Sequence, residues 1–260
     1  MDIVILGSGN LATNLSAALV KVGHKITQIY SRNIDRAEEL SKKYGTIAID
    51  DISLIRNEAD LYIIAITDKE IGNLISKVDF EKKNVVHTAG SVPLSIFPKN
   101  IEKFGVLYPF QTFSKKRQVD FSDIPICVEA NVVEFEEFLF NFARQLSDNV
   151  LKMNSQMRKQ VHLSGVFACN FVNHLYYVAG NILSKYNIDE NIIKPLIRET
   201  AEKIMDLPPL LAQTGPALRN DTESIKKHLD LLSSSPEYQQ LYKLISDGIY
   251  STYRNSEQPE

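Results

Sequence analysis

The stretch Ile3–Ala12, with the sequence IVILGSGNLA, decides the fold of the first half of the chain. An apolar run predicts a buried strand, and Gly7, Gly9 and Ala12 follow it in the spacing G-x-G-x-x-A. In that spacing the first glycine permits a tight turn, and the second lets a pyrophosphate approach the backbone. A helix predicted over residues 11–22 presents free N–H groups to the phosphates. The predicted phosphate-binding residues are Gly7, Ser8, Gly9, Asn10 and Leu11.

Around this stretch, short β-type runs alternate with amphipathic helical stretches up to about residue 150. This alternation is typical of an open parallel sheet covered by helices. Helices are predicted over residues 11–22 and 34–44 and after Asp68, whose carboxylate suits an N-cap. The predicted strands span residues 3–6, 26–30, 46–49, 61–66, 85–88, 105–108 and 126–129.

From about residue 153 the β signal stops. Only residues 207–220, LPPLLAQTGPALRN, interrupt the helical pattern there, because proline and glycine exclude a regular helix. The sequence therefore predicts a Rossmann-type α/β domain over residues 1–152 and an all-α domain over residues 153–260. Long helices with apolar stripes and little chain to cover them favour a homodimer. The predicted helices span residues 155–186, 189–206, 221–232 and 236–254.

The end of the second predicted strand indicates which dinucleotide binds. Domains specific for NAD place an acidic residue about 20 residues beyond the glycines, where it binds the ribose 2′-hydroxyl. Here the strand ends in Tyr30-Ser31-Arg32-Asn33, and a serine hydroxyl and a guanidinium suit a 2′-phosphate instead. Arg36, one helical turn further, is a second candidate. We predict NADP(H), although a solvated surface arginine is the alternative for Arg32 and Arg36.

Composition excludes other classes of function. A net charge of −3, without a basic run, argues against a nucleic-acid or membrane-surface partner. The spacing of Cys127 and Cys169 fits neither a disulfide framework nor a zinc site, so we expect two buried free thiols and no metal. The N-terminus reads as a strand and not as a signal peptide. We expect a cytoplasmic protein that acts on a small molecule.

Several polar residues follow predicted strands, at the carboxyl edge of the sheet where such folds bind ligands. Thr67 and Asp68 are candidates to contact the cofactor, with a simple helix cap as the alternative for Asp68. His87 can transfer protons near neutral pH, but a buried, hydrogen-bonded histidine fits the run VVHT equally well. Ser91 is a candidate beside the nicotinamide or the substrate, with a plain turn as its alternative.

The loop Tyr108–Ser114, YPFQTFS, is rich in aromatic and hydroxyl groups. Tyr108 and Gln111 are candidates to donate hydrogen bonds to a substrate, although an aromatic edge of the core is an equal alternative. Arg219 lies in the segment TGPALRND, before Asp221, which is well placed to cap the next helix. Arg219 can bind a substrate carboxylate or hold its own loop to an acidic residue.

Polar residues also share one face of the first long helix of the C-terminal half. At 100° per residue, these residues fall in a stripe about 80° wide, and polar groups there are costly if buried alone. We expect the stripe to face a cleft, with a hydrogen-bonded network or solvent as the alternatives. Its members are His162, Val166, Asn170, Asn173 and Tyr177.

Together these motifs resemble those of the Rossmann-like proteins with a DUF2520 C-terminal domain. The likeness rests on GSGNLA, the SR after the second strand, HTAGS, YPFQTFS, SGVFACNFVNHL and TGPALRND. That family is related to F420-dependent NADP oxidoreductases, pyrroline-5-carboxylate reductases and 6-phosphogluconate or β-hydroxyacid dehydrogenases. The resemblance implies NADP binding, a helical dimerisation domain similar to that of 6-phosphogluconate dehydrogenase, and an active site between the halves.

One departure from the related dehydrogenases matters. β-Hydroxyacid dehydrogenases use a helical K-x-x-x-N pair, and aligning its asparagine on Asn170 places Val166 where the proton-donating lysine belongs. His162 is a candidate substitute. We therefore predict an NADP(H)-dependent oxidoreductase acting on a small carbonyl, imine or hydroxy acid, and the missing lysine tilts the choice toward C=N reduction. The rival hypothesis is a non-catalytic NADP(H)-binding sensor or regulatory dimer.

Overall fold

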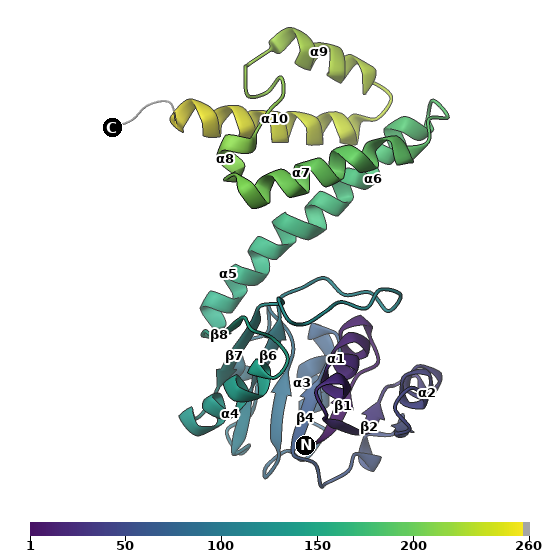
Figure 1. Ribbon diagram of the computed structural model, residues 1–260, viewed down its shortest axis with the longest axis vertical. Coiled ribbons are helices and arrows are strands. Elements are labelled where there is room, and N and C mark those ends of the chain that lie inside the picture. Colours follow the sequence, from purple (N-terminus) through teal and green to yellow (C-terminus); the bar gives the residue numbers. More distant parts are fainter. Residues whose placement is uncertain (257–260) are drawn as a thin grey trace. The chain divides into compact units, whose positions relative to one another are not determined.

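The computed structural model describes residues 1–256, and two compact units divide the chain between Phe171 and Val172. The first unit holds an eight-stranded sheet in the order β3-β2-β1-β4-β5-β6-β7-β8 (Figure 1). All neighbouring strands run parallel except β6 and β7. The strands are β1 Asp2–Leu6, β2 Lys25–Tyr30, β3 Ile47–Ile49, β4 Leu61–Ile64, β5 Asn84–His87, β6 Lys103–Pro109, β7 Ile126–Ala130 and β8 Val150–Lys152.

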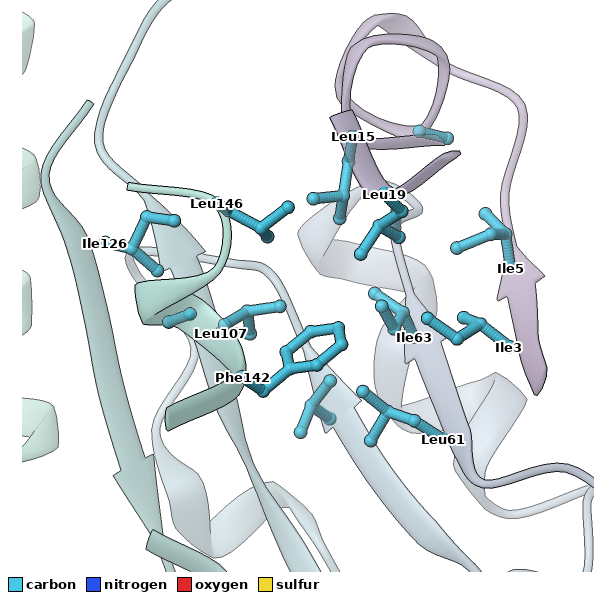
Figure 2. Close-up of a cluster of buried hydrophobic side chains, with 14 of the residues drawn as sticks. Ile3, Ile5, Leu15, Leu19, Leu61, Ile63, Leu107, Ile126, Phe142 and Leu146 are labelled. Atoms are coloured by element: carbon cyan, nitrogen blue, oxygen red, sulfur yellow. The ribbon is translucent and has the colours of Figure 1, made fainter. Parts of the chain in front are cut away.

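Helices cover both faces of this sheet. The first face packs against α1, α2 and α4, and Figure 2 shows Leu15 and Leu19 of α1 meeting Ile3, Ile63 and other strand residues of this core. The opposite face packs against α3, through Ile71, Leu74 and Ile75. The helices of this unit are α1 Asn10–Lys21, α2 Ile34–Lys42, α3 Asp68–Ile75, α4 Val133–Arg144, α5 Ser155–Gly165 and the π-helix η3 Val166–Phe171, with single turns η1 Ile52–Leu54 and η2 Leu94–Ile96.

The strand order reverses beside β1, which lies between β2 and β4. In open α/β sheets, ligands bind outside the carboxyl ends of the strands at such a switch point. The turn Gly7–Asn10 follows β1 and leads into α1, so the fold places the glycine motif at this point. The Rossmann-type architecture predicted for the first half is confirmed.

The second unit is helical and has little core of its own. Its elements are joined by polar contacts, including Asn181 to the Tyr238 hydroxyl at 2.9 Å and His228 Nδ1 to the Tyr242 hydroxyl at 2.8 Å. Among its described hydrophobic residues, only Val178 and Ala217 are buried. Within residues 1–256, no helix is long and apolar enough to span a membrane. The elements are α6 Val172–Ser184, η4 Glu190–Ile193, α7 Lys194–Asp206, α8 Pro209–Ala212, α9 Thr222–Leu231 and α10 Pro236–Ser256.

Two elements of the first unit are absent from the predictions. Helix α4 buries Phe135, Leu139 and Phe142, whose i, i+4, i+7 spacing is the ordinary signature of an amphipathic helix. Strand β8 is only three residues long, too short for a periodic signal. Strands β6 and β7 pair antiparallel, whereas the sequence analysis predicted a parallel sheet.

The sequence predicts one regular α-helix over residues 155–186, and this prediction is wrong because the segment contains a π-helix. The segment Val166–Phe171 is a π-helix between α5 and α6, and a π-turn holds one more residue than an α-turn. The rotation of 100° per residue therefore fails across η3, and the expected stripe from His162 to Tyr177 is not one continuous α-helical face. Residues 207–220 also contain helix, the single turn α8, because prolines suit the first turn of a helix.

The helical domain predicted from residue 153 begins earlier than the second compact unit. Helix α5 and η3 belong to the unit that holds the sheet. The domain boundary expected at residue 152 stays a prediction.

Candidate functional site

The turn after β1 is shaped for phosphate. Gly7 has φ +141°, and a Cβ at this position would overlap the carbonyl of Ala65, so only glycine fits. Gly9 differs, because a Cβ there would meet no protein atom within 4 Å. No protein atom therefore fills the space beside Gly9, which leaves room for a phosphate group to approach the backbone.

The N-terminus of α1 is free to bind an anion. Gly9 is its N-cap, no side chain bonds the first N–H groups, and the first turn carries no acidic residue. These N–H groups and the helix dipole together favour a phosphate. The turn thus fits the pyrophosphate of a dinucleotide.

A cavity of about 1010 Å³ extends from this turn along the carboxyl ends of the strands. This volume is at the upper end of small-molecule sites, about 300–1,000 Å³. All ten predicted cofactor residues line it, and so do residues in or just after α3 and in the β3–η1 loop that the sequence analysis missed. The predicted residues present are Gly7, Ser8, Gly9, Asn10, Leu11, Ser31, Arg32, Arg36, Thr67 and Asp68, and the unpredicted ones include Asp50, Asp51, Glu70, Asn73 and Lys77.

Near the tip of β2 the cavity lining contains hydroxyl and cationic groups, together with the carboxylates of Asp50, Asp51 and Glu70. Ser31 Oγ accepts a hydrogen bond from Ser8 Oγ at 2.8 Å, which joins the glycine turn to the second strand. Arg32 forms an ion pair with Glu70 at 3.0 Å, and its side chain is 71% exposed. Arg36 and Lys77 add two more cations to the lining. This donor set fits a phosphate monoester, the group that distinguishes NADP(H).

The N-cap predicted at Asp68 is wrong. Thr67 is the N-cap of α3, and Asp68 is the first residue of that helix. The Asp68 carboxylate instead accepts a hydrogen bond from Ser91 Oγ, in the loop after β5. Asp68 therefore joins the β4 and β5 edges of the cavity, which is compatible with its predicted place beside the cofactor.

The far end of the cavity brings together three segments that are distant in the sequence. Tyr108, near the end of β6, and His162, on α5, are joined through the Tyr108 hydroxyl and His162 Nδ1 at 3.0 Å. Both side chains lie against Gly90, where a Cβ would come within 2.7 Å of Tyr108 Cζ and of His162 Nδ1. Gly90 is thus needed for this pair to sit at the sheet edge.

The Tyr108 hydroxyl stays protonated at neutral pH. Burial, and then the negative charges of Cys127 and Asp68, raise its pKa to about 12, and the Arg158 charge partly offsets them. A protonated phenol can donate a hydrogen bond to a ring nitrogen of histidine. The pair thus places a hydroxyl and an imidazole, both able to hydrogen-bond, at the end of the cavity.

A buried ion pair fixes helix α5, and with it His162. The Arg158 side chain is fully buried, and its guanidinium bonds the Glu129 carboxylate of β7 and the Val92 carbonyl. Ser155 Oγ also donates to Glu129. The sequence analysis missed this cluster, although Ser155 and Arg158 lie one helical turn apart at the start of α5.

Of the two interpretations of His87, proton transfer or a buried histidine, the structure favours the buried histidine. The side chain is fully buried and stacks on Phe97, with ring centroids 5.7 Å apart. Burial, reinforced by the positive charge of Arg158, lowers its pKa to about 3. The imidazole is enclosed against the loop after β5 and does not line the cofactor cavity, and a role for His87 in catalysis stays a prediction.

A second cavity, of about 430 Å³, adjoins the Tyr108–His162 pair. Tyr108, Gln111 and His162 line both cavities. Cys169 of η3 lines the second one and is partly exposed, so its predicted burial is wrong, whereas Cys127 is buried as expected. Asn170 also lines this cavity, which brings it to the same region as His162.

Two predicted substrate residues lie in the second unit. Asn173 and Arg219 are both exposed there. The predicted cap at Asp221 is confirmed, since its carboxylate accepts the Ser224 N–H at 3.0 Å, and this bond lowers the pKa of Asp221. Arg219 also lowers that pKa through its charge, to a smaller extent.

Comparison with protein families gives two matches that together cover most of the chain. Residues 2–90 match the family described as NADP oxidoreductase coenzyme F420-dependent, and residues 124–249 match the domain of unknown function DUF2520. Among curated proteins, none matches the chain.

Solved structures give similarity over nearly the full length. BF3122 from Bacteroides fragilis, provisionally described as an NADP oxidoreductase, is 42% identical, with a TM-score of 0.90 over 96% of this chain and 98% of that one. Protein TM1727 from Thermotoga maritima is 22% identical, with a TM-score of 0.74 over 98% and 100%. A reductive aminase from Aspergillus terreus, in complex with NADPH and ethyl-5-oxohexanoate, shares the fold at 12% identity, with a TM-score of 0.70 over 98% and 94%.

Proposed function

Because the chain belongs to the same family as BF3122, the Rossmann-like proteins with a DUF2520 domain, we propose that it is an NADP(H)-dependent oxidoreductase that reduces a small C=O or C=N group. The cofactor is NADP(H), which supplies or accepts the hydride when it is bound. One observation carries the proposal: the cavity that begins at the phosphate turn ends at the hydrogen-bonded Tyr108–His162 pair.

The chain's own residues hold the cofactor by its charged parts. The N–H groups at the start of α1 bind the pyrophosphate, and Ser31, Arg32 and Arg36 bind the 2′-phosphate. Thr67 and Asp68 line the middle of the cavity. Gly90 lines the same cavity, so a dinucleotide held by these contacts would have its reactive end on the side of Gly90, Tyr108 and His162.

Tyr108 and His162 act on the substrate in this proposal. Reduction of C=O or C=N leaves an oxygen or nitrogen that must gain a proton, and this pair is positioned to give one. Asn170, in the adjoining cavity, donates a hydrogen bond to the same substrate. His162 thereby takes the place of the lysine that β-hydroxyacid dehydrogenases use, since Val166 stands at that position.

The rival function is a non-catalytic NADP(H)-binding sensor. Val166 in place of a lysine is the observation in its favour. The polar side chains that meet at the end of the cavity, Tyr108 and His162, support the reductase instead. Among substrates, the absent lysine supports C=N reduction over the hydroxy-acid reaction.

We also propose that the chain forms a homodimer through its helical unit. Large apolar side chains of that unit face solvent: Met205 is 81% exposed, and Leu211, Leu231 and Leu244 are each 72% exposed. Exposed apolar surface of this extent marks an association surface. Light scattering should give twice the mass of one chain, and Met205→Glu combined with Leu211→Glu should give a monomer.

The roles of Ser91, Asn173 and Arg219 stay predictions, as do the active site between the two halves and the cytoplasmic location. The hydrogen bond that Ser91 Oγ donates to Asp68, a residue of the cavity lining, supports a role for Ser91 near the cofactor. If Arg219 binds a substrate carboxylate, Arg219→Ala should raise KM for keto acids and leave neutral ketones unaffected.

The decisive experiment is an NADPH-oxidation screen of the purified chain against cyclic imines, aldehydes, ketones and keto acids. We expect turnover with at least one C=N or C=O class. Tyr108→Phe should lower kcat by about 10²-fold, in the range of a lost general acid, while NADPH affinity is retained. No turnover with any class, together with tight NADPH binding, would support the sensor instead.

A further inference from the structure

The second cavity, which we call the aromatic pocket, is a distinct compartment beside the Tyr108–His162 pair. Its volume of about 430 Å³ falls within the range of small-molecule sites. It opens from the cofactor cavity at the shared residues Tyr108, Gln111 and His162. The lining residues are Tyr108, Phe110, Gln111, Thr112, Phe113, His162, Gly165, Val166, Ala168, Cys169 and Asn170.

The aromatic walls of this pocket are held in place by the fold. The Phe110 N–H donates to the Pro125 carbonyl at 2.7 Å. Its ring lies so close to Gly165 of α5 that a Cβ there would come within 2.5 Å of Phe110 Cε2. On the other side, Phe113 stacks on the buried Phe121, with ring centroids 5.7 Å apart. The walls are therefore formed before any ligand arrives.

No lining residue of the aromatic pocket, within the described part of the chain, is Asp, Glu, Lys or Arg. The polar groups present are neutral amides and hydroxyls, together with His162 at the shared mouth. A carboxylate placed in the pocket would lose its water without gaining a cation, which is strongly unfavourable. An aromatic or apolar group, in contrast, gains contact with three rings.

We propose that the aromatic pocket binds the uncharged aromatic or cyclic part of the substrate, whose C=O or C=N carbon then lies beside Tyr108 and His162. The substrate class is thus an aryl or cyclic ketone or imine without a carboxylate next to the reacting carbon. The claim that the bound molecule is reduced rests on the proposed function. The claim that its ring binds here rests on the pocket alone.

Four ketones separate the effect of the ring from that of the charge: acetone, pyruvate, acetophenone and benzoylformate. Their affinities for the full-length chain saturated with NADP⁺ can be measured by ligand-observed NMR. The oxidised cofactor cannot reduce a ketone, so only binding is measured. We expect acetophenone to bind at least roughly tenfold more tightly than acetone and than benzoylformate, because it buries a ring without burying a charge.

Variants locate the binding in the pocket. Phe110→Ala should remove most of the advantage of acetophenone over acetone and leave NADP⁺ affinity unchanged. Phe140→Ala is the matched control, since Phe140 is a partly buried phenylalanine of α4 outside the lining of either cavity. It should leave all four ketone affinities as they are.

The wild-type chain gives a test that does not depend on a variant folding. Cys169 lines the pocket and is partly exposed, whereas Cys127 is fully buried in the sheet. N-ethylmaleimide should therefore alkylate Cys169 first, and acetophenone should slow that reaction while acetone does not.

The proposal is overturned if benzoylformate binds as tightly as acetophenone, which would mean that a cation from outside the pocket completes it. It is also overturned if acetophenone does not bind, or binds equally well to Phe110→Ala. Binding as expected, without NADPH oxidation by any ketone or imine, would instead reject the proposed reductase and leave the pocket assignment standing.

Discussion

The two ends of the cofactor cavity are built in opposite ways. The turn at the phosphate end consists of consecutive residues, Gly7–Leu11, in which Gly7 adopts a positive φ and lies against the Ala65 carbonyl. The reacting end combines Gly90, Tyr108 and His162 from three separate segments. The first end depends on the backbone of one turn, and the second depends on how α5 packs on the sheet. Substitutions at the phosphate end should therefore impair NADPH binding, and substitutions at the reacting end should impair turnover or stability.

The largest expected effect is at Gly7. Gly7→Val would place a side chain against the Ala65 carbonyl at a φ of +141°, so the turn cannot form and NADPH binding should be lost by more than about 10³-fold. Isothermal titration calorimetry measures the affinity. Gly9→Ala is the informative partner, because its Cβ meets no protein atom within 4 Å. It should keep the melting temperature and still weaken NADPH binding about tenfold; an unchanged affinity would contradict the pyrophosphate assignment.

The next effect is on the packing that supports the reacting end. Arg158→Leu removes a buried guanidinium and leaves the Glu129 carboxylate, whose side chain is 13% exposed, without its cation. We expect a loss of about 3–5 kcal/mol in the free energy of unfolding, measured by urea denaturation. Adding Glu129→Gln should recover part of that loss. If Arg158→Leu alone were neutral, the ion pair would not be what holds α5.

The buried His87 predicts a pH dependence of stability. Its folded pKa of about 3 lies below the ordinary value of 6.5, so the unfolded chain binds the proton more tightly between these values. This contribution is complete above about pH 6.5 and is lost as the pH falls toward 3, with a slope of at most about 1.4 kcal/mol per pH unit. Denaturation at several pH values should show a smaller slope for His87→Gln. An equal slope would place the titration elsewhere.

A smaller effect should separate the two ends most cleanly. Gly90→Ala would push Tyr108 and His162 apart, since its Cβ would come within 2.7 Å of both side chains. We expect turnover to fall about 10- to 100-fold, because small displacements of positioned groups are costly in catalysis. NADPH affinity should change little, because the phosphate end is untouched. Equal losses in binding and turnover would mean that the two ends are not independent.

The smallest effect concerns the choice between cofactors. Arg32→Ala should weaken NADPH binding roughly tenfold and leave NADH binding unchanged, since only NADPH carries the 2′-phosphate. Because the Arg32 side chain is exposed, added salt should screen its attraction for the 2′-phosphate. The effect of Arg32→Ala on NADPH affinity should therefore be smaller at high salt. Fluorescence titration with both cofactors is sufficient, and parallel losses for NADPH and NADH would reject the assignment of Arg32.

The sequence by itself determined the phosphate end and the class of fold. The glycine spacing, the apolar strands and the absence of an acid after β2 are local signals, because each reflects the φ, the burial or the charge of neighbouring residues. Only the tertiary structure decided the reacting end. Gly90, Tyr108 and His162 meet because β5 and β6 are neighbouring strands and Arg158 holds α5 to β7. The π-helix η3 also ended the helical register on which the stripe from His162 to Tyr177 depended. Contacts between distant segments, and an extra residue within one helical turn, leave no periodic trace in a single sequence.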